Sequence, residues 1–275
     1  MIVWLFRLSY LLFFLVSSYF FGLFDFAFTS VSFYLALLAS IILGFIGAMI
    51  MTLTFVRWSA ELRKHKEVDN PFNHHIANSL LILARQLLRI KIIVSGREHI
   101  PTKPFILVAN HQENYDIIVL KPIFKDLPLD FIAKEALFKA PIIGKWVQVL
   151  GNVPISREAD RAAAESIIKG IKLYKKGLPV AIFPEGKRSF SNQMLPFKAG
   201  AFKLAMKPKA DILIVTQYNV VNTFKGWPFK KQNIYVHIHP LLRYEEYKEY
   251  SSQELADEVK KRIQTQLDLF AQKHG

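Results

Sequence analysis

The sequence of 275 residues contains no cysteine. Disulfides, thiolate nucleophiles and cysteine-ligated zinc are therefore excluded, and thiol usage gives no information on the cellular compartment. The sequence also lacks a G-x-S-x-G motif, which carries the nucleophilic serine of many hydrolases. Catalysis through a cysteine, or through a serine in that motif, is excluded as well.

Charged residues are scarce at the start of the chain. Residues 1–57 contain Arg7, Asp25 and Arg57 and carry a net charge of +1, so +13 of the formal net charge of +14 belongs to residues 58–275. A basic excess favours anionic partners. Because an apolar segment lies beside it, we expect anionic membrane lipids or an acidic carrier protein. Nucleic acid is not expected as a partner, since no nucleic-acid-binding signature interleaves aromatic residues with the basic ones.

The same charge-poor segment is long enough for two membrane helices. It contains 17 uncharged residues between Arg7 and Asp25 and 31 more from Phe26 to Val56, whereas a helix needs about 20 apolar residues to span a bilayer. The sequence DFAFTS supplies a short turn between the two runs. We therefore expect a hydrophobic helical hairpin of about residues 4–24 and 31–56.

Both ends of such a hairpin lie on one side of the membrane. Lysines and arginines flank the hairpin and are absent from its internal loop, which favours the cytoplasmic side for both ends. We expect residues 1–57 to anchor the chain in the cell membrane and residues 58–275 to form a catalytic domain in the cytoplasm. A cleaved signal peptide fits less well, because the apolar run is long and lacks a small-x-small cleavage site. A monotopic arrangement of both helices in one leaflet stays open.

From residue 92 onward, short apolar runs alternate with helical patterns. The runs that predict strands are IIV, FILVA, DFIA, PVAIF, ILIV and IYVHIH. The clearest helix extends from Asp160 to Lys176, with Gly177 just past its end. The pattern of residues 80–94 predicts an amphipathic helix followed by a strand. This helix would lie either on anionic headgroups or against the domain core. With an amphipathic last helix of about residues 252–273, the pattern predicts an α/β domain with a largely parallel sheet flanked by helices.

Polar residues follow the strand FILVA directly, in NHQENYD. The carboxyl ends of strands are where α/β proteins usually build their sites. On one helix His111 and Asp116 would point about 140° apart, so they must straddle a turn. If Asp116 begins the next helix, its carboxylate can accept a hydrogen bond from one ring nitrogen of His111 and leave the other as a general base. The alternative is a turn histidine with Asp116 as a helix cap.

A second polar loop, PEGKRS, follows the strand PVAIF. Pro184 and Gly186 favour a tight loop, and Gly186 lets backbone or ligand approach closely. Arg188 offers a planar fork suited to a phosphate, and Lys187 adds positive charge. Glu185 could accept a hydrogen bond from a substrate hydroxyl. Taken alone, a loop of this composition is also typical of a solvated turn.

Together these motifs resemble the glycerophospholipid acyltransferase family, in particular the 1-acyl-sn-glycerol-3-phosphate acyltransferases, over about residues 90–245. NHQENYD is similar to the family's NHQ-x-x-x-D block, GNVPISR to its second block and FPEGKRS to its FPEGTRS block, in the family's order and spacing. The stretch AKEALFKAPIIGKWVQVLG also resembles the segment before the second block. The combination is specific, although no single block is.

Several positions depart from the family pattern. Val153 and Pro154 stand where the family usually has a hydrophobic residue and a phenylalanine, and Lys187 replaces a threonine. The fourth block is present only as ILIVTQY, without its usual proline. Glu113 stands where a serine is common and places a negative charge beside His111. The sequence alone gives no reason for Glu113.

The resemblance implies transfer of an acyl chain from acyl-CoA or acyl carrier protein to the sn-2 hydroxyl of lysophosphatidic acid, giving phosphatidic acid. It implies that His111 removes the hydroxyl proton and that Asp116 orients the imidazole. The implied substrate-binding residues are Asn110, Lys134, Arg157, Glu185, Gly186, Lys187 and Arg188. The competing hypotheses are another acceptor (glycerol 3-phosphate or another lysophospholipid), a thioesterase-like hydrolase, and a non-catalytic membrane-binding protein.

No cofactor or metal is expected. His74 and His75 fall in a polar linker, and His237 and His239 fall on one face of a strand. A zinc site would need a third ligand, and the sequence identifies none for either pair.

Overall fold

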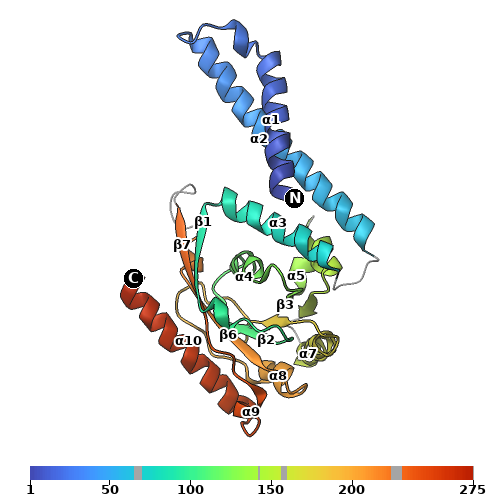
Figure 1. Cartoon of the computed structure of the whole chain (residues 1–275), viewed down its shortest axis with the longest axis vertical. Coiled ribbons are helices and arrows are strands. Elements are labelled where there is room, and N and C mark those ends of the chain that lie inside the picture. The colour runs from blue at the N-terminus through green and yellow to red at the C-terminus, as the bar shows by residue number, and fades with distance from the viewer. Residues whose placement is uncertain (65–69, 142, 156–159, 224–230, 275) are drawn as a thin grey trace.

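Two long helices project from an α/β body (Figure 1). This computed structural model describes the chain except for residues 65–69, 142, 156–159, 224–230 and 275. The two helices are α1 (Ile2–Phe20) and α2 (Val31–Arg63). The predicted hairpin is therefore confirmed, although α2 continues past residue 57.

The hairpin turn is built from local signals in the sequence. Gly22 adopts a left-handed conformation with φ of 60°, and the 3₁₀ helix η1 (Leu23–Asp25) follows it. Ser30 then caps α2, because its side-chain oxygen accepts a hydrogen bond from the Phe33 N–H at 3.2 Å.

The hairpin helices pack through small residues and expose large ones. The buried residues of α2 recur at every fourth position over Ala36, Ser40, Gly44, Ala48, Thr52 and Val56. This spacing lets helix backbones approach closely, and a Cβ on Gly47 would lie 2.5 Å from the Phe13 ring. Mean hydropathy is 1.7 for the apolar window of α1 and 2.4 for that of α2. Both helices are thus long and apolar enough to cross a bilayer, which is consistent with membrane association.

The α/β body contains a mixed, mostly parallel sheet of seven strands in the order β1-β7-β6-β2-β5-β3-β4. The strands are β1 (Ile90–Ser95), β2 (Ile106–Ala109), β3 (Asp130–Lys134), β4 (Val153–Ile155), β5 (Val180–Ile182), β6 (Ile212–Tyr218) and β7 (Gln232–Ile238). The β6–β7 pair is antiparallel and the other neighbouring pairs are parallel. All six predicted strands are present, and β4 is an additional strand at the sheet edge.

Helices cover both faces of the sheet (Figure 1). The remaining helices are α3 (Pro71–Leu87), α4 (Asp116–Leu120), α5 (Glu135–Phe138), α6 (Ile143–Val149), α7 (Asp160–Lys175), α8 (Lys203–Met206), α9 (Tyr244–Tyr247) and α10 (Ser252–His274). Short 3₁₀ helices are η2 (Arg97–His99), η3 (Lys121–Phe124), η4 (Ala199–Phe202) and η5 (Val220–Asn222). The predicted α7 and α10 are confirmed within one or two residues.

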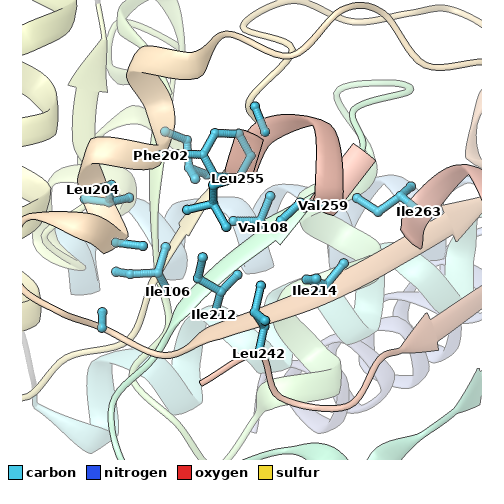
Figure 2. Packing of buried hydrophobic residues seen from close by; sticks show 14 of the residues in the cluster. Ile106, Val108, Phe202, Leu204, Ile212, Ile214, Leu242, Leu255, Val259 and Ile263 are labelled. Carbon is cyan, nitrogen blue, oxygen red and sulfur yellow. The ribbon is translucent and has the colours of Figure 1, made fainter. Parts of the chain in front are cut away.

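Alternate residues of the central strands enter two different cores. Ile106 and Val108 of β2 pack with residues of α8 and α10 on one face (Figure 2). Leu107 and Ala109 pack with residues of α4 and η3 on the other face. This is the period-two alternation of a strand buried on both sides, so the ends of β2 and β5 are held between two packed layers.

The prediction of a polar linker at His74 and His75 was wrong. His74 and His75 lie in α3, not in a polar linker, because Pro71 occupies the first turn and the Asn70 side chain accepts a hydrogen bond from the Phe72 N–H. His74 is buried, and its Nδ1 contacts Lys121 Nζ at 3.2 Å.

A third core joins the base of the hairpin to the α/β body. It combines Phe6 of α1 and Val56 of α2 with Ile76 of α3 and Trp146 of α6. The Trp146 indole N–H donates a hydrogen bond to the Val56 carbonyl at 2.7 Å. The hairpin is therefore packed against the body through a buried apolar contact.

We expect Trp146→Ala to lower the unfolding free energy of the detergent-solubilised protein by about 3–5 kcal/mol, because it leaves a cavity in this core. Thermal denaturation measures the effect. Trp58→Ala is the matched control, since Trp58 is 57% exposed and Trp146 is 3% exposed. Equal changes in both variants would show that the third core does not stabilise the joint.

Candidate active site

The two polar loops predicted from the sequence emerge side by side. Strands β2 and β5 are parallel neighbours, with Ile106 opposite Val180 and Val108 opposite Ile182. Residues 110–116 and 183–190 therefore leave the same edge of the sheet. Backbone hydrogen bonds join them, because the Ser189 N–H donates to the His111 carbonyl at 2.9 Å and the Phe190 N–H donates to the Gln112 carbonyl at 3.2 Å.

His111 and Asp116 form the expected contact. His111 Nδ1 lies 2.6 Å from Asp116 Oδ2 across the turn that precedes α4. Since a carboxylate oxygen accepts, Nδ1 is the nitrogen that carries the proton. This leaves His111 Nε2 for proton exchange with a substrate.

The Asp116 carboxylate is completely buried and is held by the backbone of its own loop. The Gln112 N–H donates to Oδ2 at 2.8 Å, and the Glu113 N–H donates to both oxygens at 3.2 and 3.3 Å. Burial raises the pKa of Asp116, while the hydrogen bonds from His111 and from these N–H groups lower it. Asp116 thus orients the imidazole from a fixed position.

The His111 ring lies against Phe183, with ring centroids 4.3 Å apart and planes inclined by 14°. Phe183 follows β5, so the second loop supplies one wall for the imidazole. This stacking and the bond to Asp116 together restrict both the tilt and the rotation of the ring.

Glu185 connects the two loops. Its Oε1 accepts a hydrogen bond from the His111 N–H at 2.7 Å, and its Oε2 accepts one from the Leu195 N–H at 2.8 Å. The residue is 2% exposed, and burial raises the pKa of its carboxyl to about 7. Gly186 beside it has φ of 69°, and a Cβ there would approach the Lys198 side chain at 3.1 Å.

Behind the two loops lies a buried amide network that sequence reasoning missed. Asn110 donates to the Gln217 carbonyl and accepts from the Gln217 N–H. The Gln112 side chain donates to Gln217 and Asn192, and it accepts from the N–H groups of Val220 and Val221. Gln112 falls inside the NHQ motif and Gln217 lies one residue before the end of the buried strand β6, which were the available signals. The Asn110 and Gln112 side chains hold β6 against the first loop through their hydrogen bonds to the Gln217 backbone.

The basic residues are placed more openly. Arg188 is partly buried, Lys187 is exposed, and Lys134 is exposed at the carboxyl end of β3, the other neighbour of β5. Arg188 Nη1 lies 3.2 Å from Glu113 Oε2, and its guanidinium carbon lies 4.5 Å from the centre of the Phe190 ring. Arg157 lies outside the described residues.

His237 lies in β7 and His239 directly follows the end of this strand, and their ring centroids are 4.7 Å apart. His237 Nδ1 contacts the Ser95 hydroxyl and His239 Nε2 contacts the Thr216 hydroxyl, each at 2.8 Å. In the part of the chain that the structure describes, no three histidine, aspartate or glutamate side chains come together as a metal site would require.

Several known proteins are similar in sequence to this chain. The family model "Acyltransferase" matches residues 91–219, which contain both loops. A 1-acyl-sn-glycerol-3-phosphate acyltransferase of Borreliella burgdorferi is 34% identical over 65% of this chain and 74% of its own length. The enzymes of that name from Chlamydomonas reinhardtii and Saccharomyces cerevisiae are 36% and 35% identical. Those matches cover 52% and 48% of this chain but only 43% and 45% of the two relatives.

The fold also has a solved counterpart. The crystal structure of the 1-acyl-sn-glycerophosphate (LPA) acyltransferase from Thermotoga maritima matches with a TM-score of 0.64, covering 80% of this chain and 95% of that one. The identity of 23% limits this likeness to the fold. With the family match and the Borreliella relative, the chain belongs to the acyltransferase family that includes the 1-acyl-sn-glycerol-3-phosphate acyltransferases.

Proposed function

We propose that this protein transfers an acyl chain from an acyl thioester to the sn-2 hydroxyl of 1-acyl-sn-glycerol 3-phosphate, giving phosphatidic acid. The observation that carries the proposal is the His111–Asp116 pair, at 2.6 Å, on the same sheet edge as Arg188. A base and a phosphate ligand are the two groups that this acceptor requires. The names of the relatives support the same reaction.

The proposed chemistry needs no covalent enzyme intermediate. The sn-2 hydroxyl oxygen attacks the thioester carbonyl while His111 Nε2 takes its proton. A C–O bond forms, the C–S bond breaks, and the imidazolium returns the proton to the departing thiolate. Asp116 stabilises the imidazolium through Nδ1. Absence of cysteine is consistent with direct transfer.

Arg188 is the proposed ligand for the phosphate of the acceptor. A guanidinium fork binds phosphate with two parallel hydrogen bonds, so it would place the sn-2 hydroxyl at a fixed distance from His111. Lys187, Lys134 and Arg157 would add positive charge. Gly186 and Glu185 would shape the loop around the acceptor, Glu185 through its hydrogen bonds to the backbone. Asn110 would also shape the acceptor site, through its hydrogen bond to β6.

We propose the cell membrane as the location, with residues 1–57 as the anchor and residues 58–275 as a catalytic domain on the cytoplasmic side. The exposed apolar surface of α1 and α2 supports the anchor. Anionic headgroups would attract the basic domain. Acyl-CoA and acyl carrier protein are both acidic donors that this charge would favour.

A direct assay tests the reaction. Purified protein in vesicles receives a labelled acyl chain on CoA or on acyl carrier protein, with lysophosphatidic acid, glycerol 3-phosphate or lysophosphatidylcholine as acceptor. We expect labelled phosphatidic acid with at least one donor. Acylation of another acceptor alone would refute the substrate assignment, and release of free fatty acid alone would indicate a hydrolase.

We expect His111→Ala to reduce phosphatidic acid formation by about 10²- to 10⁴-fold, the usual contribution of a general base. His75→Ala is the matched control, because this histidine is exposed on α3. Initial rates under saturating substrates measure the loss, and thermal denaturation verifies folding. Near-normal activity of a folded His111→Ala variant would refute the mechanism.

We expect Arg188→Ala to raise the KM for lysophosphatidic acid by roughly ten- to a hundredfold, as removal of a charge-assisted hydrogen bond does. The effect on kcat should be smaller, and Arg188→Lys should recover part of the loss because it keeps the charge without the fork. Arg262→Ala in α10 is the control. An unchanged KM in Arg188→Ala would remove Arg188 from the acceptor site.

A further inference from the structure

We propose that the Glu113 carboxylate, which pairs with Arg188, is displaced from it by the phosphate of the acceptor. Glu113 would thereby set the affinity and selectivity of the site for phosphate. This inference rests on the proposed function, because it takes Arg188 as the phosphate ligand. It also gives a reason for Glu113, which departs from the serine common at this position.

The Glu113 carboxylate binds Arg188 at the position proposed for the phosphate of the acceptor. Glu113 Oε2 lies 3.2 Å from Arg188 Nη1 and also accepts a hydrogen bond from the Asn114 N–H at 3.2 Å. The two side chains of the ion pair are 20% and 32% exposed, so a ligand from solution can reach them. Carboxylates and phosphates both accept charge-assisted hydrogen bonds from a guanidinium.

Arg188 can remain in place when Glu113 leaves. Its guanidinium lies over the Phe190 ring at 4.5 Å, a contact that does not involve Glu113. The Phe190 backbone is fixed by the Gln112 carbonyl, and Phe190 has a left-handed φ of 54°. The guanidinium therefore has two contacts, one with an aromatic ring and one with an exchangeable carboxylate.

Glu113 can move its side chain without disturbing the dyad. Its backbone N–H is the group that donates to Asp116, whereas its carboxylate contacts Arg188. The two tasks use different parts of the residue. A phosphate close to an unmoved Glu113 carboxylate would be repelled, since like charges at contact distance oppose binding strongly in a partly buried site. Exchange of one anion for the other avoids that repulsion.

The test compares Glu113→Gln with Glu258→Gln, which removes the same charge from a Glu–Arg ion pair within α10. We expect Glu113→Gln to lower the KM for lysophosphatidic acid by about three- to tenfold, with kcat changed by less than about twofold. Inorganic phosphate should inhibit this variant at correspondingly lower concentration. A KM that rises or stays constant would overturn the proposal, because Glu113 would then position Arg188 or be irrelevant to it.

A double variant separates exchange at Arg188 from a general field effect. In the Arg188→Ala background, Glu113→Gln should lower the KM by a smaller factor than in the unsubstituted protein, because the repulsion of the phosphate is removed but there is no guanidinium to release. If Glu113→Gln lowers the KM equally in both backgrounds, Glu113 acts only as a nearby negative charge and the displacement is refuted.

A second readout does not need acyl transfer. Phenylglyoxal modifies accessible arginines, and mass spectrometry of the digested protein reports the fraction of Arg188 modified. Inorganic phosphate should protect Arg188 at lower concentration in Glu113→Gln than in the unsubstituted protein, with the Arg262 peptide as internal control. Equal protection in both proteins would overturn the inference. Failure to make phosphatidic acid would refute the proposed function alone, because this protection can still be measured.

Discussion

The buried carboxylate of Asp116 is the constraint on which the candidate site depends. A carboxylate without exposure is strongly unfavourable unless its oxygens are hydrogen-bonded. The partners here are the His111 ring and the N–H groups of Gln112 and Glu113, so the observed conformation of the first loop satisfies Asp116. That conformation presents the carbonyls of His111 and Gln112 to the second loop, which donates Ser189 and Phe190 N–H groups to them.

Glu185 is a second buried carboxyl group whose oxygens are hydrogen-bonded, and it connects the two loops. Both of its oxygens accept hydrogen bonds from backbone N–H groups, one at His111 and one at Leu195. The sequence suggested that Glu185 contacts a substrate hydroxyl. In the structure its carboxylate is 2% exposed, and both of its oxygens bind backbone N–H groups that hold the site together. Two buried carboxylates therefore act on His111, one through its ring and the other through its backbone.

Local signals were enough to predict the hairpin, the strands and the contact between His111 and Asp116, because each depends on residues close in sequence. The amide network was not predictable, since Asn110 and Gln217 are 107 positions apart and meet only when β2 pairs with β6. The same holds for Glu113 and Arg188, which are 75 positions apart. Strand β4 escaped prediction because three residues with a central proline give little strand signal.

The joint between hairpin and body bears on how an amphiphilic acceptor would be presented to the site. The Ile2 N–H of α1 donates to the Ser79 hydroxyl of α3, and His74 of α3 contacts Lys121 in η3, directly after the helix that Asp116 begins. A packed connection of this kind fixes the site relative to the hairpin, whereas a flexible linker would allow a broad range of distances. On the proposed function, the acceptor keeps its acyl chain in the bilayer while its phosphate and hydroxyl reach the loops. The fixed height of the site above the membrane would then help to select which hydroxyl meets His111.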